Sequence, residues 1–222
     1  MTKLLDIYRT LLHALGHRGW WPGDSPLEVM VGAVLTQNTN WQNVEKAIAN
    51  LKRADMLGAC KLANAAPAEL EALIRPAGYY RQKAARLGRL ARWLNGRGES
   101  DEAAIEALRT LSSDRLRQEL LAIKGIGPET ADSILLYALE KPVFVVDSYT
   151  VRILARHGLA EAESSYDEVQ ALFQDGLPGE VELLKDYHAQ LVEVGKRFCR
   201  RSRPRCAECP LLELLGRPIL EQ

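Results

Sequence analysis

The sequence lacks any long apolar stretch. No run of 18 or more residues is both apolar and uncharged, and the first residues, MTKLLDIYRTLL, mix charged and apolar side chains at helical spacing. A membrane-spanning helix needs about 20 apolar residues in a row, and a secretory signal needs an unbroken apolar centre. We therefore expect a cytoplasmic protein with no membrane association.

Strand patterns are almost missing as well. Sustained alternation of apolar and polar residues is absent apart from the short segment PVFVVD at 142–147. From residue 4 to residue 93 the apolar side chains instead recur every three or four positions, as at Leu27, Val31 and Val34. This pattern is typical of amphipathic helices, so the sequence predicts an all-α fold.

The sequence also lacks net charge, because 29 basic residues balance 29 acidic ones. Nucleic-acid binders often carry a basic excess, so the total argues against a polyanionic partner. The charge is segregated, however: residues 196–205, KRFCRRSRPR, contain six basic residues and no acid. This run is either a solvated surface or a phosphate contact, and Arg200 and Arg201 are its candidate DNA-binding residues.

Residues 120–151, LLAIKGIGPETADSILLYALEKPVFVVDSYTV, predict two helices joined by a tight turn. The first helix ends near Ile123 and the second extends from about Glu129 to Leu139. Two glycines around one aliphatic residue suit a turn with unusual backbone angles, and the N–H groups at a helix start can bind phosphate. The candidate DNA contacts in this turn are Lys124, Gly125, Ile126 and Gly127.

This hairpin, followed by Pro142, an apolar run and Asp147, resembles the helix-hairpin-helix (HhH-GPD) DNA glycosylases related to endonuclease III. Further matching motifs follow in the same order: VGAVLTQNTNW at 31–41, IRPAGYYRQKAARL at 74–87, VDSYTVRILARHGL at 146–159 and YHAQLVEVGKRFC at 187–199.

The resemblance implies two helical lobes with an active-site cleft between them. The expected lobes are a central one, 26–138, that ends in the hairpin, and a second one built from 1–25 and 139–222. It also implies a monomer that acts in base excision repair on double-stranded DNA containing a damaged base.

Within that family the aspartate at the position of Asp147 is catalytic and faces the sugar of an extruded nucleotide. Cleavage of an N-glycosidic bond develops positive charge on the sugar, which a carboxylate stabilises directly or by activating water. The alternative is that Asp147 only caps a helix that begins at Ser148. The two roles are compatible.

The resemblance places Glu129 where family members that also cut the DNA backbone carry a lysine. A carboxylate cannot form the Schiff base of that lyase reaction, so we expect a monofunctional glycosylase. The adenine-mismatch branch of the family needs a further acidic residue, and Ala33 stands where we would expect it. An adenine-mismatch glycosylase is therefore less favoured. Two alternatives stay open: a glycosylase/lyase that uses another amine, and a DNA-damage-binding protein without catalysis.

Two short segments resemble the base pocket of the 3-methyladenine glycosylase branch. Their pocket residues are Trp20, Trp21 and Pro22 in the first segment and Trp41 in the second. An N-alkylated purine is cationic, so aromatic faces would attract it after it is flipped out of the duplex. The alternative is that these tryptophans are core residues. The expected substrate is an N-alkylated purine such as 3-methyladenine.

The motif VGAVLTQNTNW at 31–41 contains Gln37 and Asn38. The resemblance implies that one of them fills the gap left by the flipped nucleotide or reads the opposite base. The sequence leaves open which of the two does so.

Three cysteines, Cys199, Cys206 and Cys209, have the spacing at which many family members bind a 4Fe–4S cluster. Leu215 occupies the position of the fourth cysteine, and Cys60 lies far away on another predicted helix, where we expect it to be buried. Since a cubane normally takes four thiolates, three possibilities remain. The cluster is weakened, it has been lost, or the site binds zinc with another ligand.

Overall fold

The computed structural model describes residues 3–219 of the chain. Within this range it contains thirteen α-helices, two 3-10 segments, one π-helical segment and no β-strand. The prediction of an all-α fold is therefore confirmed. None of the described helices combines the length and the apolar character needed to cross a bilayer.

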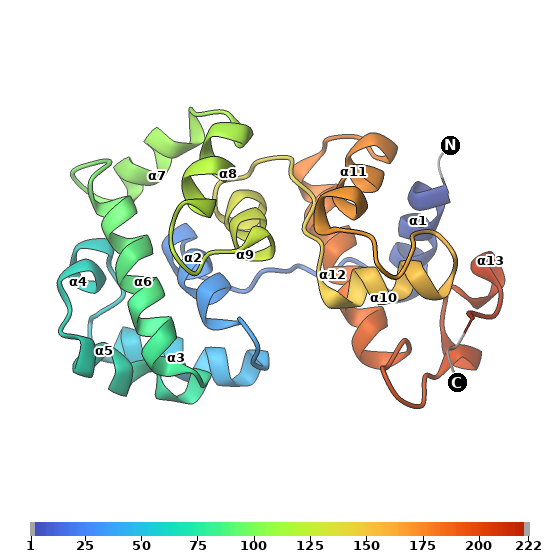
Figure 1. Ribbon diagram of the computed structural model, residues 1–222, viewed down its shortest axis with the longest axis horizontal. Coiled ribbons are helices and arrows are strands. Elements are labelled where there is room, and N and C mark those ends of the chain that lie inside the picture. Colours follow the sequence, from blue (N-terminus) through green and yellow to red (C-terminus); the bar gives the residue numbers. More distant parts are fainter. Residues whose placement is uncertain (1–2, 220–222) are drawn as a thin grey trace. The chain divides into compact units, whose positions relative to one another are not determined.

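The chain divides into two compact units (Figure 1). We call Trp21–Lys141 the hairpin unit, and Met1–Trp20 together with Pro142–Gln222 the split unit. The helices of the hairpin unit are α2 (Pro26–Leu35), α3 (Trp41–Arg53), α4 (Ala59–Asn64), α5 (Pro67–Ile74), α6 (Tyr80–Asn95), α7 (Asp101–Arg109), α8 (Ser113–Leu121) and α9 (Pro128–Ser133), with short segments η1 (Arg75–Ala77) and η2 (Ile134–Ala138).

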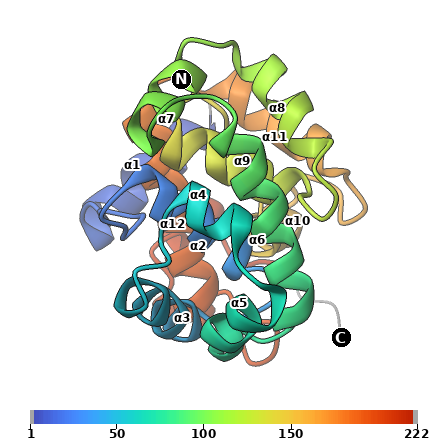
Figure 2. The same ribbon diagram turned by 90° about the vertical axis from the view of Figure 1, so that its left-hand side faces the viewer.

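Helix α2 is the core of the hairpin unit. Ser25 caps it by accepting a hydrogen bond from the Glu28 N–H at 3.2 Å, and Pro26 occupies the first turn, where its missing N–H costs nothing. The helix is apolar on nearly every side, and all of residues 27–35 are buried. It packs against α3, α6, α9 and η2 (Figure 2).

A lysine is buried in this apolar core. The Lys83 ammonium on α6 donates to the Leu35 carbonyl at 2.9 Å and to the Ala77 carbonyl at 2.7 Å. Burial, with a smaller contribution from the positive charge of the nearby Arg86, lowers the pKa of Lys83 to about 8. Since Leu35 ends α2, Lys83 fixes the point from which the Gln37 turn begins.

The split unit is built from α1 (Lys3–Leu15), α10 (Ser148–Arg156), α11 (Tyr166–Gly176), α12 (Val181–Arg197), the 3-10 segment η3 (Cys206–Glu208) and α13 (Leu212–Leu215). Its core contains an aromatic cluster in which Phe144 stacks on Phe173 at 3.8 Å and Tyr187 meets both rings edge-on. Tyr187 also donates a hydrogen bond to the Leu4 carbonyl at 2.9 Å, which attaches α1 to α12.

One glycine determines how closely α10 approaches α12. A Cβ atom on Gly195 would lie 2.2 Å from Cδ1 of Tyr149, closer than two carbon atoms can pack. Only glycine therefore allows Tyr149 to lie against α12 at this point. The contact sets the position of the start of α10, where Asp147 lies.

Candidate active site and DNA-contact surfaces

Asp147 is the N-cap residue of α10, and its carboxylate is held firmly. One oxygen, Oδ1, accepts hydrogen bonds from the Thr150 N–H at 2.7 Å and from the Thr150 hydroxyl at 2.8 Å. The residue is only 9% exposed. Capping therefore uses one carboxylate oxygen, while the other, Oδ2, points elsewhere.

The second oxygen faces a histidine that sequence reasoning missed. His188 Nε2 on α12 lies 3.8 Å from Asp147 Oδ2. Burial lowers the pKa of His188, and this effect outweighs the opposite effect of the Asp147 charge. His188 is therefore neutral near pH 7. It lies within the motif YHAQLVEVGKRFC, but nothing in its spacing indicates that it faces Asp147.

The hairpin begins two residues earlier than expected, since α8 ends at Leu121, and α9 begins at Pro128. Gly125 has a φ of 97°, and a Cβ atom there would lie 2.7 Å from Nε of Arg86. Gly127 has extended backbone and nothing within 4 Å of an added Cβ. The two glycines thus differ: Gly125 is required by the fold, whereas Gly127 leaves open space at the surface.

The Gln37 side chain joins the turn after α2 to the hairpin. Its amide donates to the Gly125 carbonyl at 3.2 Å and to the Thr130 hydroxyl at 2.8 Å, and its oxygen accepts from Arg86. Asn38, with a φ of 54°, is exposed at the tip of the same turn. The two neighbouring residues therefore have different surroundings, one attached to the hairpin and one facing solvent.

Two of the predicted pocket tryptophans meet in the hairpin unit. The Trp21 ring contacts Trp41 edge-on at 5.3 Å and lies at the same centroid distance from Tyr137, which sequence reasoning missed. Both indoles lie over Gly32 of α2, where an added Cβ would approach Trp21 Nε1 to 3.1 Å. Both tryptophans are half-buried, and Pro22 is exposed.

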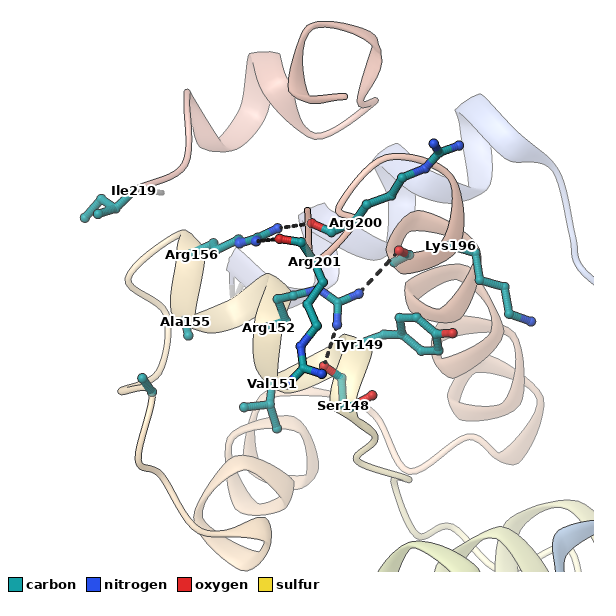
Figure 3. Close-up of a pocket in the computed structure, with 12 residues that line it drawn as sticks. Ser148, Tyr149, Val151, Arg152, Ala155, Arg156, Lys196, Arg200, Arg201 and Ile219 are labelled. Atoms are coloured by element: carbon teal, nitrogen blue, oxygen red, sulfur yellow. Dashed lines mark hydrogen bonds between the residues drawn. The ribbon is translucent and has the colours of Figure 1, made fainter. Parts of the chain in front are cut away.

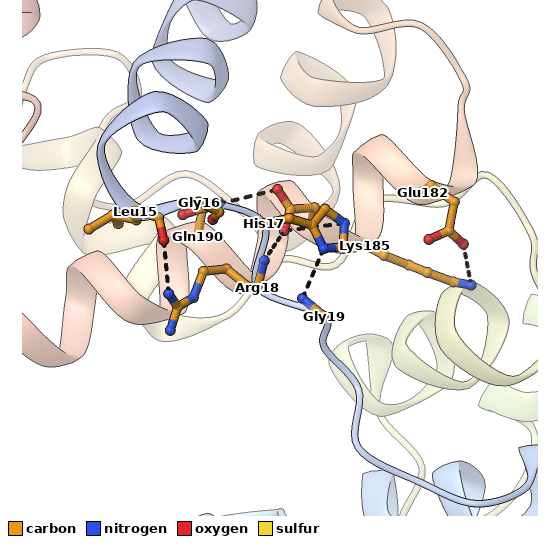
Figure 4. A network of polar contacts seen from close by, with 9 residues as sticks. Leu15, Gly16, His17, Arg18, Gly19, Glu182, Lys185 and Gln190 are labelled. Carbon is orange, nitrogen blue, oxygen red and sulfur yellow. Dashed lines mark hydrogen bonds and ion pairs between the residues drawn. The ribbon is translucent and has the colours of Figure 1, made fainter.

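Trp20 belongs to the split unit, where the Lys196 ammonium lies 5.6 Å from its ring centre. The segment before it is attached to the buried Asp186, whose Oδ1 accepts from the Arg18 N–H at 2.7 Å (Figure 4). Gln190 donates to Asp186 at 3.2 Å and to the Gly16 carbonyl at 2.7 Å. These contacts fix the chain that leads to Trp20.

An open groove of about 1220 Å³ lies beside the start of α10 in the split unit (Figure 3). Five basic residues line it: Arg152, Arg156, Lys196, Arg200 and Arg201. Among the described residues that line it, none is acidic. Such a groove has the electrostatic character of a phosphate-binding surface.

Two of these arginines also hold the basic loop, which we define as residues 199–205, against α10. Arg156 donates to the Arg200 carbonyl at 2.7 Å and to the Arg201 carbonyl at 3.1 Å (Figure 3). Arg152 donates to the Cys199 carbonyl at 2.8 Å. The side chains of Arg200 and Arg201 are exposed. The four-residue spacing of Arg152 and Arg156 places them on one helix face, a signal that sequence reasoning could have used.

The three clustered cysteines gather around one small cavity in the split unit, which is also lined by His157 and Leu212. None of the four cysteines of the chain forms a disulfide. Burial raises the pKa of Cys209, and its neighbours Cys199 and Cys206 add to that effect. Between residues 3 and 219, however, no three His, Cys, Asp or Glu side chains are close enough to share a single metal ion.

Cys60, in contrast, is exposed, so the expectation that it is buried is wrong. In the short helix α4 the positions that face the core are Ala59 and Leu62, three residues apart, and Cys60 points outward.

Comparison with known proteins identifies the family. The model of the HhH-GPD superfamily base excision DNA repair proteins matches residues 31–178, more than half of the chain. The chain belongs to this superfamily. The assignment made from the sequence motifs is thus confirmed, and the chain is an endonuclease III-like DNA glycosylase.

Similar HhH-GPD proteins include a Methanocaldococcus jannaschii protein whose name describes a DNA repair glycosylase. It is 47% identical over 211 residues, which cover 95% of this chain and 94% of the relative. Endonuclease III of Thermotoga maritima is 32% identical over 187 residues, covering 83% and 79%. The solved 3-methyladenine DNA glycosylase of H. pylori, bound to 1,N6-ethenoadenine, has a TM-score of 0.72, with 31% identity and coverage of 88% and 98%.

Proposed function

We propose that this HhH-GPD protein is a monofunctional DNA glycosylase that removes an N-alkylated purine such as 3-methyladenine from double-stranded DNA. The bond between the base and the sugar is hydrolysed, and an abasic site remains for another enzyme. The observation that carries the proposal is the geometry of Asp147, whose carboxylate is nearly buried. Thr150 fixes one of its oxygens, and we propose that the other, which lies near His188, acts on the substrate.

Asp147 acts on the sugar. As the glycosidic bond breaks, positive charge develops on the deoxyribose ring, and a fixed carboxylate stabilises this charge or orients the attacking water. A group that is already oriented needs no reorganisation during the reaction, and the two hydrogen bonds from Thr150 supply that orientation. Neutral His188 on the other side of the carboxylate adds no positive charge that would weaken its effect.

The absence of lyase chemistry is inferred from Glu129. Its side chain is exposed on the first turn of α9, at the position of the lysine in family members that cleave the backbone. No amine is available at this position to attack the sugar, so the reaction ends with base release.

An N-alkylated purine is the substrate that this site would favour. The alkylated ring is cationic and leaves readily, so an enzyme needs mainly to recognise it by stacking and by cation–π attraction. The perpendicular pair Trp21 and Trp41 offers aromatic faces for this purpose, with Tyr137 beside it. The likeness to a solved 3-methyladenine glycosylase supports the same class of substrate.

DNA contact is divided between two surfaces. We assign the hairpin to contact with one segment of the DNA backbone, through exposed Lys124 and Gly125 and half-buried Gly127, which surround the buried Ile126. Arg200 and Arg201 in the basic groove bind phosphates as well. Phosphate contacts position the protein without reading sequence, which suits an enzyme that recognises damage. Asn38, exposed at its turn, is the residue we assign to the gap in the duplex, and Gln37 supports it. We propose that the enzyme acts as a monomer.

The cysteine loop would hold a 4Fe–4S cluster through Cys199, Cys206 and Cys209. Three thiols around one cavity fit the donor set of such a cluster, which cysteine thiolates hold. A bound cluster would cross-link residues 199–209 and so hold the basic loop in one shape.

The experiment is a panel of duplexes, each with one lesion, incubated with the protein and then treated with alkali to reveal abasic sites. We expect release of 3-methyladenine to exceed that of thymine glycol and of adenine opposite 8-oxoguanine. Borohydride trapping on the same duplexes should give no covalent complex. A trapped complex would show a lyase, and DNA binding without any base release would show a damage-binding protein.

A further inference from the structure

The cysteine site of this chain has three thiols where a cubane needs four protein ligands. Cys199 lies two residues after the end of α12, Cys206 begins the 3-10 segment η3 and Cys209 directly follows it, so all three come from one short loop. Leu215 stands at the fourth position of the spacing, and an aliphatic side chain cannot bind iron. A fourth ligand must therefore come from another part of the fold.

A histidine from α10 enters the same cavity. His157 is the C-cap residue of α10 and lines the cavity together with the three cysteines. Within the described part of the chain, its Nδ1 atom is buried and has no hydrogen-bond partner. A buried nitrogen without a partner is unfavourable, so its presence in an otherwise apolar cavity needs an explanation.

Ligation of metal explains it. Imidazole nitrogen is a ligand for iron in clusters where histidine replaces cysteine, and the lone pair of a buried ring nitrogen is available for that bond. We therefore infer that His157 Nδ1, with the thiolates of Cys199, Cys206 and Cys209, completes a Cys₃His ligand set for a 4Fe–4S cluster. This inference rests on the proposed cluster, but it does not depend on the glycosylase reaction.

The neighbouring residue fits this assignment. Arg156 donates a hydrogen bond from Nη1 to Sγ of Cys199 at 3.3 Å, and it also holds the Arg200 and Arg201 carbonyls. Hydrogen bonds to ligand sulfur are how a protein supports a cluster from outside the ligand set. Two adjacent residues at the end of α10 therefore lie at the cysteine site: His157 lines the cavity and Arg156 donates to a ligand sulfur.

The test uses the full-length chain, purified without oxygen and reconstituted with ferrous iron and sulfide. Iron and acid-labile sulfide are measured per chain, and the reduced cluster is examined by electron paramagnetic resonance with ¹⁵N-labelled histidine. We expect about four irons per chain and a nitrogen coupling that changes with the label. His157→Ala should lose the coupling and fall to about three irons or fewer per chain.

Two variants make the result specific. His157→Cys should restore about four irons with four thiolates and show no nitrogen coupling, which also answers the objection that the alanine variant folds poorly. His13→Ala, which changes an exposed histidine on α1, should behave as the wild type does.

The outcomes separate the two proposals. A wild-type protein that takes up no iron, or that binds one zinc ion instead, would overturn the cluster and the role of His157 together. A wild-type cluster that keeps its iron and its spectrum in His157→Ala would overturn the role of His157 and leave the cluster in place.

Discussion

Asp147 is both a helix cap and the proposed catalytic group, and two substitutions separate these roles. Asn caps helices about as well as Asp does, and its amide oxygen can still accept the two hydrogen bonds from Thr150. Asp147→Asn should therefore change the free energy of unfolding by less than about 0.5 kcal/mol. Asp147→Ala removes the cap and leaves the buried Thr150 hydroxyl without this acceptor, so it should cost about 1–3 kcal/mol.

Catalysis should respond differently to the same two variants. Both remove the negative charge that faces the sugar, so both should lower the rate of base release by roughly 10²–10³-fold, the effect of deleting one stabilising group in an active site, or about 3–4 kcal/mol. Binding to undamaged duplex should be nearly unchanged, since the proposed phosphate contacts lie in the basic groove and not at Asp147.

The assay combines single-turnover release of the base with urea unfolding of each variant. Asp147→Asn is the decisive protein, because it keeps the cap and loses the charge. Near-wild-type release by this variant would refute the catalytic role. Equal loss of stability in both variants would show that Asn does not replace Asp147 as the helix cap. The prediction that the two substitutions separate capping from catalysis would then be wrong.

Three further predictions concern the hairpin unit. Gly127→Ala should keep the stability of the wild type but weaken binding to all duplexes alike in a titration, whereas Gly125→Ala should cost about 1–3 kcal/mol of stability because of its positive φ and the clash with Arg86. Lys83 has a lower pKa in the folded protein, about 8, than the ordinary 10.5, so the unfolded chain binds more protons between these values. The unfolding free energy of the wild type, relative to Lys83→Met, should therefore rise by about 2 kcal/mol from pH 8 to pH 10, and a flat difference would contradict the burial argument. Trp21→Ala should slow release of methylated base by about 1–3 kcal/mol and Trp21→Phe by much less, in single-turnover assays; equal rates in all three proteins would place Trp21 in the core alone.

Local signals in the sequence predicted the helices and the hairpin well. Glycine, proline and apolar spacing act over a few residues, so the turn at 124–128 and the cap at Asp147 could be inferred without the fold. The family motifs then supplied the proposed chemistry of these positions.

Contacts between distant segments could not be predicted in this way. The difference between Gly125 and Gly127 depends on Arg86, which only the packing of α6 brings to the hairpin. Likewise, His188 and His157 are ordinary helix residues by spacing, and their roles depend on which buried neighbour they face. Long-range packing has no short sequence signature, which is why these residues were missed.

The side chain of Gln37 has a consequence for how the protein would search DNA. Its hydrogen bonds to Gly125 and Thr130 connect the hairpin to the turn that carries Asn38. A hairpin that slides from phosphate to phosphate would then carry Asn38 past each base pair at a constant distance. Weak base pairs would be sensed during sliding, without a separate closing motion at every site.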